Sequence, residues 1–224
     1  MTEAVEQPGT VATKLTGMRR TAARRMVKAW AAPVFHLGVD VDMTAALASK
    51  GAGVTVSDIL LLACSTALQS HPALNAWYDE ETVTLVDHVN IGLAVATEAG
   101  LVVPVVQRVD TLDLEKVAAA RRDVVERART GALAMADVTG GTFTISNLGM
   151  LGIDQFDAIL NVPQVAILAV SSTRQQQVWT ASGPDWKPVA RFTLTCDHRA
   201  VDGATGARFL GELRSTLERG PEAP

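Results

Sequence analysis

The sequence predicts an α/β fold in which helices pack against a mixed, largely antiparallel β-sheet. Three patterns support this prediction. Residues 189–196 alternate apolar and polar side chains, as a strand with two different faces does. Residues 164–171 form a nearly continuous apolar run, which is typical of a central strand covered on both sides. Residues 112–128 and 204–218 carry apolar side chains at helical spacing.

Size and composition narrow the class of protein. With 224 residues and 48% hydrophobic content, the chain can bury a full core, and we expect one large domain. A net charge of -4 argues against nucleic acid as the main partner, because phosphate binding needs a concentrated positive field. Cys64 and Cys196 lie in apolar segments without a CxxC motif, so we expect free thiols in a reducing cytoplasm. The sequence shows no signal peptide, and the apolar run at 59–68 is too short to span a bilayer, so no membrane partner is expected.

The N-terminal part divides into a tail and a helix. Residues 1–14 lack apolar periodicity and are predicted to be a flexible tail, and residues 15–220 are predicted to form the functional domain. Thr16 can cap a helix over residues 18–31, which Pro33 ends. We interpret its basic residues as a solvated face, since no aromatic stacking residues accompany them. They are Arg19, Arg20, Arg24, Arg25 and Lys28.

Strands and a buried helix follow. Residues 35–43 alternate as a strand with one wet face, and His36 lies on the polar side. Ser57 or Asp58 can cap a buried helix that runs to about residue 70. Three extended segments are expected next, and a tight turn at 98–100 joins the last two into a hairpin. These segments are residues 82–86, 89–96 and 101–106.

The second half supplies further strands. After the helix at 112–128, a Gly140-Gly141 pair introduces a strand over 142–146. Alternation places Thr142, Thr144 and Ser146 on one face of this strand. Residues 174–181 and 188–196 are predicted to form a hairpin around Ser182, Gly183 and Pro184.

Ionisable side chains are concentrated in residues 197–203, between the last strand and the last helix. This stretch holds an acid, an imidazole, a cation and a second acid within seven residues. Extending the strand register places His198 on the inward, apolar side, in a turn where a scaffold can present a side chain to a cleft. The alternative is an ordinary half-buried histidine beside a helix cap at Asp202. Residue types alone leave both interpretations open.

Other kinds of site have weak support. Cys196 and His198 are two residues apart, but the other histidines form no HxxxH pair, so no metal site is predicted. A GxxxxGK[ST] phosphate loop is also missing. Ser146 lacks a GxSxG elbow, so its hydroxyl fits a stabilising role better than that of a covalent nucleophile.

Residues 198–203 (HRAVDG), with Asp197 before them, resemble the HRxxDG signature of a known family. The family is the catalytic domain of dihydrolipoamide acyltransferases, the core component of 2-oxo acid dehydrogenase complexes. Five more blocks resemble that family in the same order, and together they cover about residues 15–218. These blocks are residues 18–26 (MRRTAARRM), 90–95 (NIGLAV), 100–105 (GLVVPV), 140–149 (GGTFTISNLG) and 161–168 (NVPQVAIL).

The resemblance implies a two-layer fold like that of chloramphenicol acetyltransferase and a CoA-dependent acyltransferase activity. It also implies a homotrimer, or a larger cage of trimers, with active sites between neighbouring subunits. His198 would be the general base, and Ser146 would donate a hydrogen bond to the oxyanion across the subunit interface. Asp202 would orient the loop or assist the base. Acetyl-CoA is the expected co-substrate, with no permanently bound cofactor.

Some positions depart from the family pattern. The sequence contains neither a lipoyl domain nor a peripheral-subunit-binding domain. Leu62 stands where many members have lysine, and Val34 replaces the histidine that commonly follows Pro33, with a histidine displaced to His36. These changes concern the acceptor, so His36 and Leu62, together with Asn147 beside the serine, are candidate substrate-binding residues.

Three functions are compatible with these residues. The first is transfer of an acetyl group from acetyl-CoA to a small-molecule hydroxyl, as in stand-alone members that act in tetronate antibiotic biosynthesis. The second is the core acyltransferase of a 2-oxo acid dehydrogenase complex, which acts on dihydrolipoamide. The third is a non-catalytic trimeric scaffold, and the presence of both Ser146 and His198 argues against it.

Overall fold

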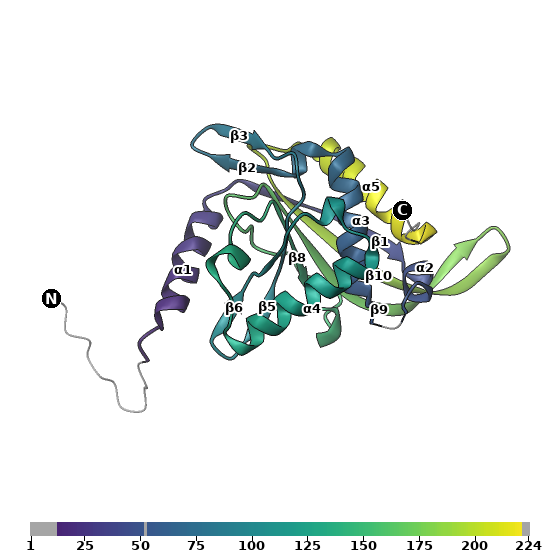
Figure 1. Ribbon diagram of the computed structural model, residues 1–224. Coiled ribbons are helices and arrows are strands. Elements are labelled where there is room, and N and C mark those ends of the chain that lie inside the picture. The colour runs from purple at the N-terminus through teal and green to yellow at the C-terminus, as the bar shows by residue number, and fades with distance from the viewer. Residues whose placement is uncertain (1–12, 52, 221–224) are drawn as a thin grey trace, which may run out of the picture.

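The computed structural model describes residues 13–51 and 53–220, and its centre is a six-stranded mixed sheet (Figure 1). The strand order is β1-β10-β9-β8-β4-β7. All neighbours are antiparallel except β8, which runs parallel to both β4 and β9. The strands are β1 (Val34–Asp42), β4 (Ile91–Leu93), β7 (Val105–Val106), β8 (Phe143–Asn147), β9 (Ala166–Thr180) and β10 (Gly183–Asp197).

A layer of helices covers one face of this sheet (Figure 1). Helix α5 contacts β1 and β10, and α3 lies between α5 and α4. These helices are α2 (Thr44–Ala48), α3 (Val56–Ser70), α4 (Leu114–Thr130) and α5 (Gly203–Arg219). Helix α1 (Gly17–Trp30) stands apart at the opposite side from the β9–β10 hairpin. The predicted two-layer α/β fold is therefore confirmed.

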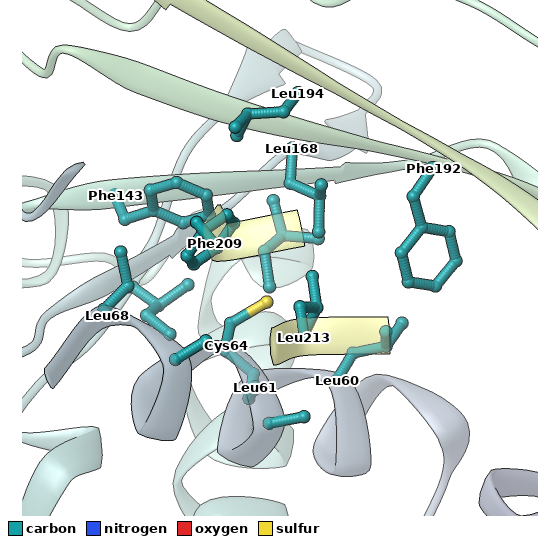
Figure 2. Close-up of a cluster of buried hydrophobic side chains, with 14 of the residues drawn as sticks. Leu60, Leu61, Cys64, Leu68, Phe143, Leu168, Phe192, Leu194, Phe209 and Leu213 are labelled. Carbon is teal, nitrogen blue, oxygen red and sulfur yellow. The ribbon is translucent and has the colours of Figure 1, made fainter. Parts of the chain in front are cut away.

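The main core lies between the sheet and the helix layer (Figure 2). Phe143 and Phe209 meet there with ring centroids 5.7 Å apart. Each fully buried side chain of this size stabilises the fold by about 1.5–3 kcal/mol. The core side chains labelled in Figure 2 are Leu60, Leu61, Cys64, Leu68, Phe143, Leu168, Phe192, Leu194, Phe209 and Leu213.

Smaller elements complete the chain. The two-stranded sheet β2 (Ala76–Asp79) and β3 (Thr82–Leu85) borders the main sheet, and β5 (Val95–Thr97) pairs with β6 (Gly100–Val102). The hairpin predicted at 98–100 is thus confirmed, but neither α2 nor β2 was predicted. Among the described residues, short 3₁₀ turns lie at Pro72–Leu74, Val109–Thr111, Met135–Val138 and Gly149–Leu151.

The longest strands differ from the prediction in their continuity. Residues 164–171 and 174–181 were expected to be separate strands, whereas β9 runs through both. Phe192 pairs with Val170 and Ala190 pairs with Thr173, so two residues of β9 oppose one of β10. Such a bulge leaves a residue unpaired without ending the strand, and it interrupts the side-chain alternation.

Helix α3 begins earlier than predicted. Thr55, rather than Ser57 or Asp58, is the cap residue. The Thr55 N–H and hydroxyl both donate to Asp58 Oδ2, each at 2.7 Å. Asp58 therefore closes a capping box from inside the first turn.

Two further expectations concern the chain as a whole. Of the predicted N-terminal tail, residues 1–12 lie outside the described residues. Within the described part of the chain, no helix combines the length and apolar character needed to cross a bilayer.

Candidate active site

His198 lies in the turn between β10 and α5. Its N–H donates to Pro33 O at 2.9 Å, and its ring packs against Phe35 with centroids 4.6 Å apart. The side chain is exposed, so the prediction of an inward histidine is wrong for the single subunit. The strand ends at Asp197, whose carbonyl accepts hydrogen bonds from Ala200 N and Val201 N. Because the backbone turns there, the alternation of β10 no longer sets the direction of the imidazole.

Asp202 is the N-cap of α5. Its Oδ1 accepts a hydrogen bond from Thr205 N at 2.7 Å, which is the helix-cap role that the sequence left open. This backbone hydrogen bond lowers the pKa of the Asp202 carboxyl below its ordinary value. Asp202 therefore orients the turn by fixing the start of the helix that follows His198.

Ser146 belongs to the parallel strand β8. Phe143 and Ile145 point into the main core, so Ser146 and Thr144 lie on the face away from α3 and α5. This confirms the predicted shared face of the hydroxyl side chains. The Ser146 side chain is half-buried, near the end of the strand.

Two polar networks anchor the strand that carries Ser146. Thr144 Oγ1 donates to Gln164 Oε1 at 2.6 Å and accepts from Asn161 Nδ2 at 3.2 Å. Asn161 and Gln164 belong to the block at 161–168 that resembles the family. Their hydrogen bonds to Thr144 could not be predicted from the sequence, because no local pattern indicates contacts between segments this far apart.

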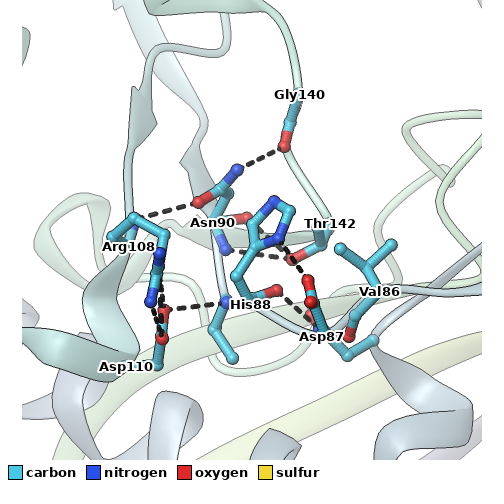
Figure 3. Close-up of polar contacts among 10 residues, drawn as sticks. Val86, Asp87, His88, Asn90, Arg108, Asp110, Gly140 and Thr142 are labelled. Atoms are coloured by element: carbon cyan, nitrogen blue, oxygen red, sulfur yellow. Dashed lines mark hydrogen bonds and ion pairs between the residues drawn. The ribbon is translucent and has the colours of Figure 1, made fainter.

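The second network holds the start of β8 through Asn90 (Figure 3). Asn90 Nδ2 donates to Gly140 O at 2.8 Å, and Asn90 Oδ1 accepts from Arg108 N at 2.8 Å. Asn90 N also donates to Thr142 Oγ1 at 3.1 Å. The blocks at 90–95 and 140–149 are therefore joined by hydrogen bonds across about 50 residues of sequence.

Ser146 and His198 lie far apart within one subunit. The sheet register aligns Ser146 with Ala169, and Ala169 with Thr193. His198 follows Thr193 by five residues. At standard strand dimensions, the separation is about 16 Å along the strands and about 10 Å across them. A single carbonyl group cannot contact both side chains, so one subunit does not assemble the predicted pair.

Comparisons with known proteins decide the family. The model of the 2-oxoacid dehydrogenases acyltransferase (catalytic domain) matches residues 7–223. The chain belongs to this family. The acetyltransferase component of the pyruvate dehydrogenase complex from Zymomonas mobilis is 34% identical over 92% of this chain and 49% of that protein. The chain thus spans about half the length of this curated acyltransferase.

Solved structures support the same acyltransferase family. A probable dihydrolipoamide acetyltransferase from Listeria monocytogenes has a TM-score of 0.91 at 28% identity, covering 96% of this chain and 98% of that one. The dihydrolipoamide acetyltransferase of Azotobacter vinelandii gives 0.89 at 29% identity, covering 97% of each chain. That structure comes from work on a serine, a histidine and an asparagine in its catalytic mechanism. Chloramphenicol acetyltransferase, 14% identical with a TM-score of 0.60 over 87% of this chain and 94% of its own, shares the fold.

Of the three candidate substrate-binding residues in this acyltransferase domain, His36 lines a cavity. The cavity has a volume of about 440 Å³, and His36 Nδ1 lies 2.9 Å from Thr195 Oγ1 at its edge. Leu62 is half-buried in the helix layer and does not line it. Asn147 Oδ1 accepts from Gly149 N at 2.9 Å and shapes the turn after β8. The cavity is lined by Ala29, Trp30, Ala32, Val34, His36, Asp157, Ala158, Ile159, Leu160 and Thr195.

Both cysteines of this acyltransferase domain are buried. Burial raises the pKa of the Cys196 thiol to about 12, and burial also raises the pKa of Cys64. Both cysteines are therefore poor nucleophiles at neutral pH. Within residues 13–51 and 53–220, no group of three or more His, Cys, Asp or Glu side chains is placed to hold a metal ion.

Proposed function

We propose that the chain is the catalytic core of a dihydrolipoamide acyltransferase, which moves an acetyl group between CoA and a dihydrolipoamide thiol. One observation carries this proposal. In the Azotobacter vinelandii enzyme the studied serine precedes the histidine by 52 residues, and the asparagine follows the histidine by four. Ser146, His198 and Asp202 have the same spacing. Asp202 replaces the asparagine, and either side chain can cap the helix that follows.

The comparisons favour a thiol acceptor over a small-molecule hydroxyl, which was the first of the three functions considered from the sequence. The Zymomonas, Listeria and Azotobacter relatives are all described as dihydrolipoyl or dihydrolipoamide acetyltransferases. The departures at His36 and Leu62 put the identity of the acceptor in doubt. Leu62 does not line the cavity, so of these two residues His36 remains the candidate for a contact with the acceptor.

The proposed mechanism is direct transfer. His198 accepts the proton of the acceptor thiol while the sulfur attacks the thioester carbonyl, and a C–S bond forms. The Ser146 hydroxyl donates a hydrogen bond to the resulting oxyanion. When the intermediate collapses, the bond to the CoA sulfur breaks, and the imidazolium returns the proton to that sulfur. A positioned base contributes about 10²- to 10⁴-fold, and one oxyanion donor about 10²- to 10³-fold.

This mechanism requires two copies of the chain. Since Ser146 and His198 are far apart in one subunit, we propose that each copy gives His198 to one neighbour and Ser146 to the other. Head-to-tail contacts of this kind close into a ring, and a homotrimer is the proposed ring. Exposed apolar side chains on α1 support burial against a neighbour, because Val27 is 74% and Trp30 is 80% exposed.

The assay uses the purified chain with acetyl-CoA and dihydrolipoamide. We expect rapid release of CoA, and His198→Ala should lower the rate by at least about 10²-fold. Its melting temperature should stay close to that of the wild type, because the imidazole is exposed. Turnover with small hydroxyl acceptors but not with dihydrolipoamide would contradict the acceptor. A loss below about tenfold in the variant would remove His198 as the base.

A further inference from the structure

An ion pair between the buried carboxylate of Asp197 and the more exposed guanidinium of Arg199 spans the position of His198. Asp197 is 2% exposed, and its carboxylate accepts from Arg199 Nε at 2.9 Å and from Arg199 Nη2 at 2.6 Å. Asp197 Oδ1 also accepts from the Arg199 N–H at 3.0 Å. The residues immediately before and after His198 are therefore joined by a bidentate, charge-assisted hydrogen-bond pair.

An aromatic ring packs against the guanidinium group of Arg199. Arg199 Cζ lies 4.0 Å from the centroid of the Tyr78 ring, which is a close cation–π contact. Tyr78 is the single tyrosine of the sequence, and it lies on β2, outside the main sheet. Its backbone is itself fixed, since Tyr78 N donates to Pro163 O at 2.7 Å.

The same turn is fixed from the side of β1. His198 N donates to Pro33 O, and the Phe35 ring packs against the imidazole. The ring nitrogens of His198 have no hydrogen-bond partner within residues 13–51 and 53–220. The direction of the imidazole is therefore set by the backbone of residues 197–199 and by ring packing.

We propose that Tyr78 and Arg199, with Asp197, are positioning residues that aim the His198 imidazole at the neighbouring copy. They act through the backbone of the turn and need not touch either substrate. The proposal rests on the proposed acyl transfer, because the function of the positioning is to place the base. Loss of the Tyr78 ring frees one face of Arg199, and a base displaced by about 1 Å can cost about 10²-fold in rate.

Tyr78→Leu and Tyr78→Phe form the first matched pair of variants. Leucine removes the ring, so we expect kcat to fall by about tenfold while KM for acetyl-CoA stays within about twofold. Phenylalanine keeps an aromatic face for the guanidinium and should restore at least about half of the wild-type kcat. A tyrosine that served only the fold would lower the melting temperature without this split between kcat and KM.

Arg199→Lys and Arg191→Lys form the second pair. Arg191 makes a similar fork on Asp40, at 2.7 and 2.8 Å, elsewhere on β10. Lysine keeps the charge but cannot form the fork. We expect Arg199→Lys to lower kcat by about 10²-fold and Arg191→Lys to leave kcat unchanged.

Three kinetic outcomes overturn the proposal. They are wild-type kcat in Tyr78→Leu, equal losses in Tyr78→Leu and Tyr78→Phe, or equal losses in Arg199→Lys and Arg191→Lys. Crystal structures test the geometry without any assay. Tyr78→Leu should displace the His198 ring from its position 4.6 Å from Phe35, and an unmoved ring contradicts the proposal. A wild-type protein without turnover but with a displaced ring in this variant would reject the acyl-transfer function and keep the positioning.

Discussion

His198 and Asp202 share one turn, but they depend on different parts of the structure. The imidazole is exposed and is held through Phe35 and the backbone, whereas the Asp202 carboxylate is bonded to Thr205 N at the start of α5. A charged carboxylate at a helix N-terminus also interacts favourably with the helix dipole. Asp202 thus links the geometry of the candidate base to the stability of the last helix.

The Asp202 cap predicts a pH-dependent effect on stability. The hydrogen bond with Thr205 N lowers the folded-state pKa of Asp202, so its stabilising contribution is complete above the unfolded value of about 3.9 and is lost as pH falls through the folded pKa. Asp202→Ala should therefore melt below the wild type at pH 7, and the gap should narrow in acid. Asp202→Asn keeps a cap and should melt close to the wild type at pH 7. Thermal unfolding across this pH range checks the trend, and a constant gap contradicts it.

Helices α3 and α4 are joined by a charge pair that local sequence does not reveal. Asp58 is fully buried and accepts from Thr55 within its own helix start and from Arg121 Nε at 2.5 Å. The sequence predicted Asp58 only as a possible cap, because its partner on α4 is 63 residues away. Since α3 supplies much of the core behind the sheet, this pair fixes part of the layer that supports the site.

Arg121→Met should leave the Asp58 carboxylate buried without its counter-ion. Breaking such a pair costs about 3–5 kcal/mol of unfolding free energy. Arg129→Met removes the same charge from an exposed position on the same helix and should change stability by less than about 0.5 kcal/mol. Urea unfolding of the two variants gives the comparison, and equal losses would show that the buried pair has no special role.

Across the whole molecule, periodicity predicted the elements better than their pairings. Alternation located β1 and β8 within one residue, because side-chain period follows from strand geometry. It also located the end of β10, but that strand begins at Gly183, five residues before the predicted start. The short strand β2 was not predicted, because four residues are too few to show a clear alternation of apolar and polar side chains. The exposure of His198 was not predicted, because side-chain alternation gives no information about residues beyond the end of a strand. The contact between Tyr78 and Arg199 depends on tertiary structure alone.

The assembled molecule, rather than the single chain, is the proposed unit of function. The register of β8, β9 and β10 places Ser146 and His198 about 16 Å apart along the strands. Both residues nevertheless lie at accessible positions, the imidazole exposed and the serine half-buried. A site built from two copies explains why a base and an oxyanion donor would be retained so far apart.

Mixed oligomers of Ser146→Ala and His198→Ala show whether the active site combines residues from two copies of the chain. Each variant alone lacks one partner at every interface and should be nearly inactive. When equal amounts are unfolded together and reassembled, about a quarter of the interfaces in a head-to-tail ring combine an intact serine with an intact histidine. We therefore expect the mixture to recover about a quarter of wild-type turnover. Mixed oligomers that form, as shown by mass, but stay as inactive as the separate variants would contradict it.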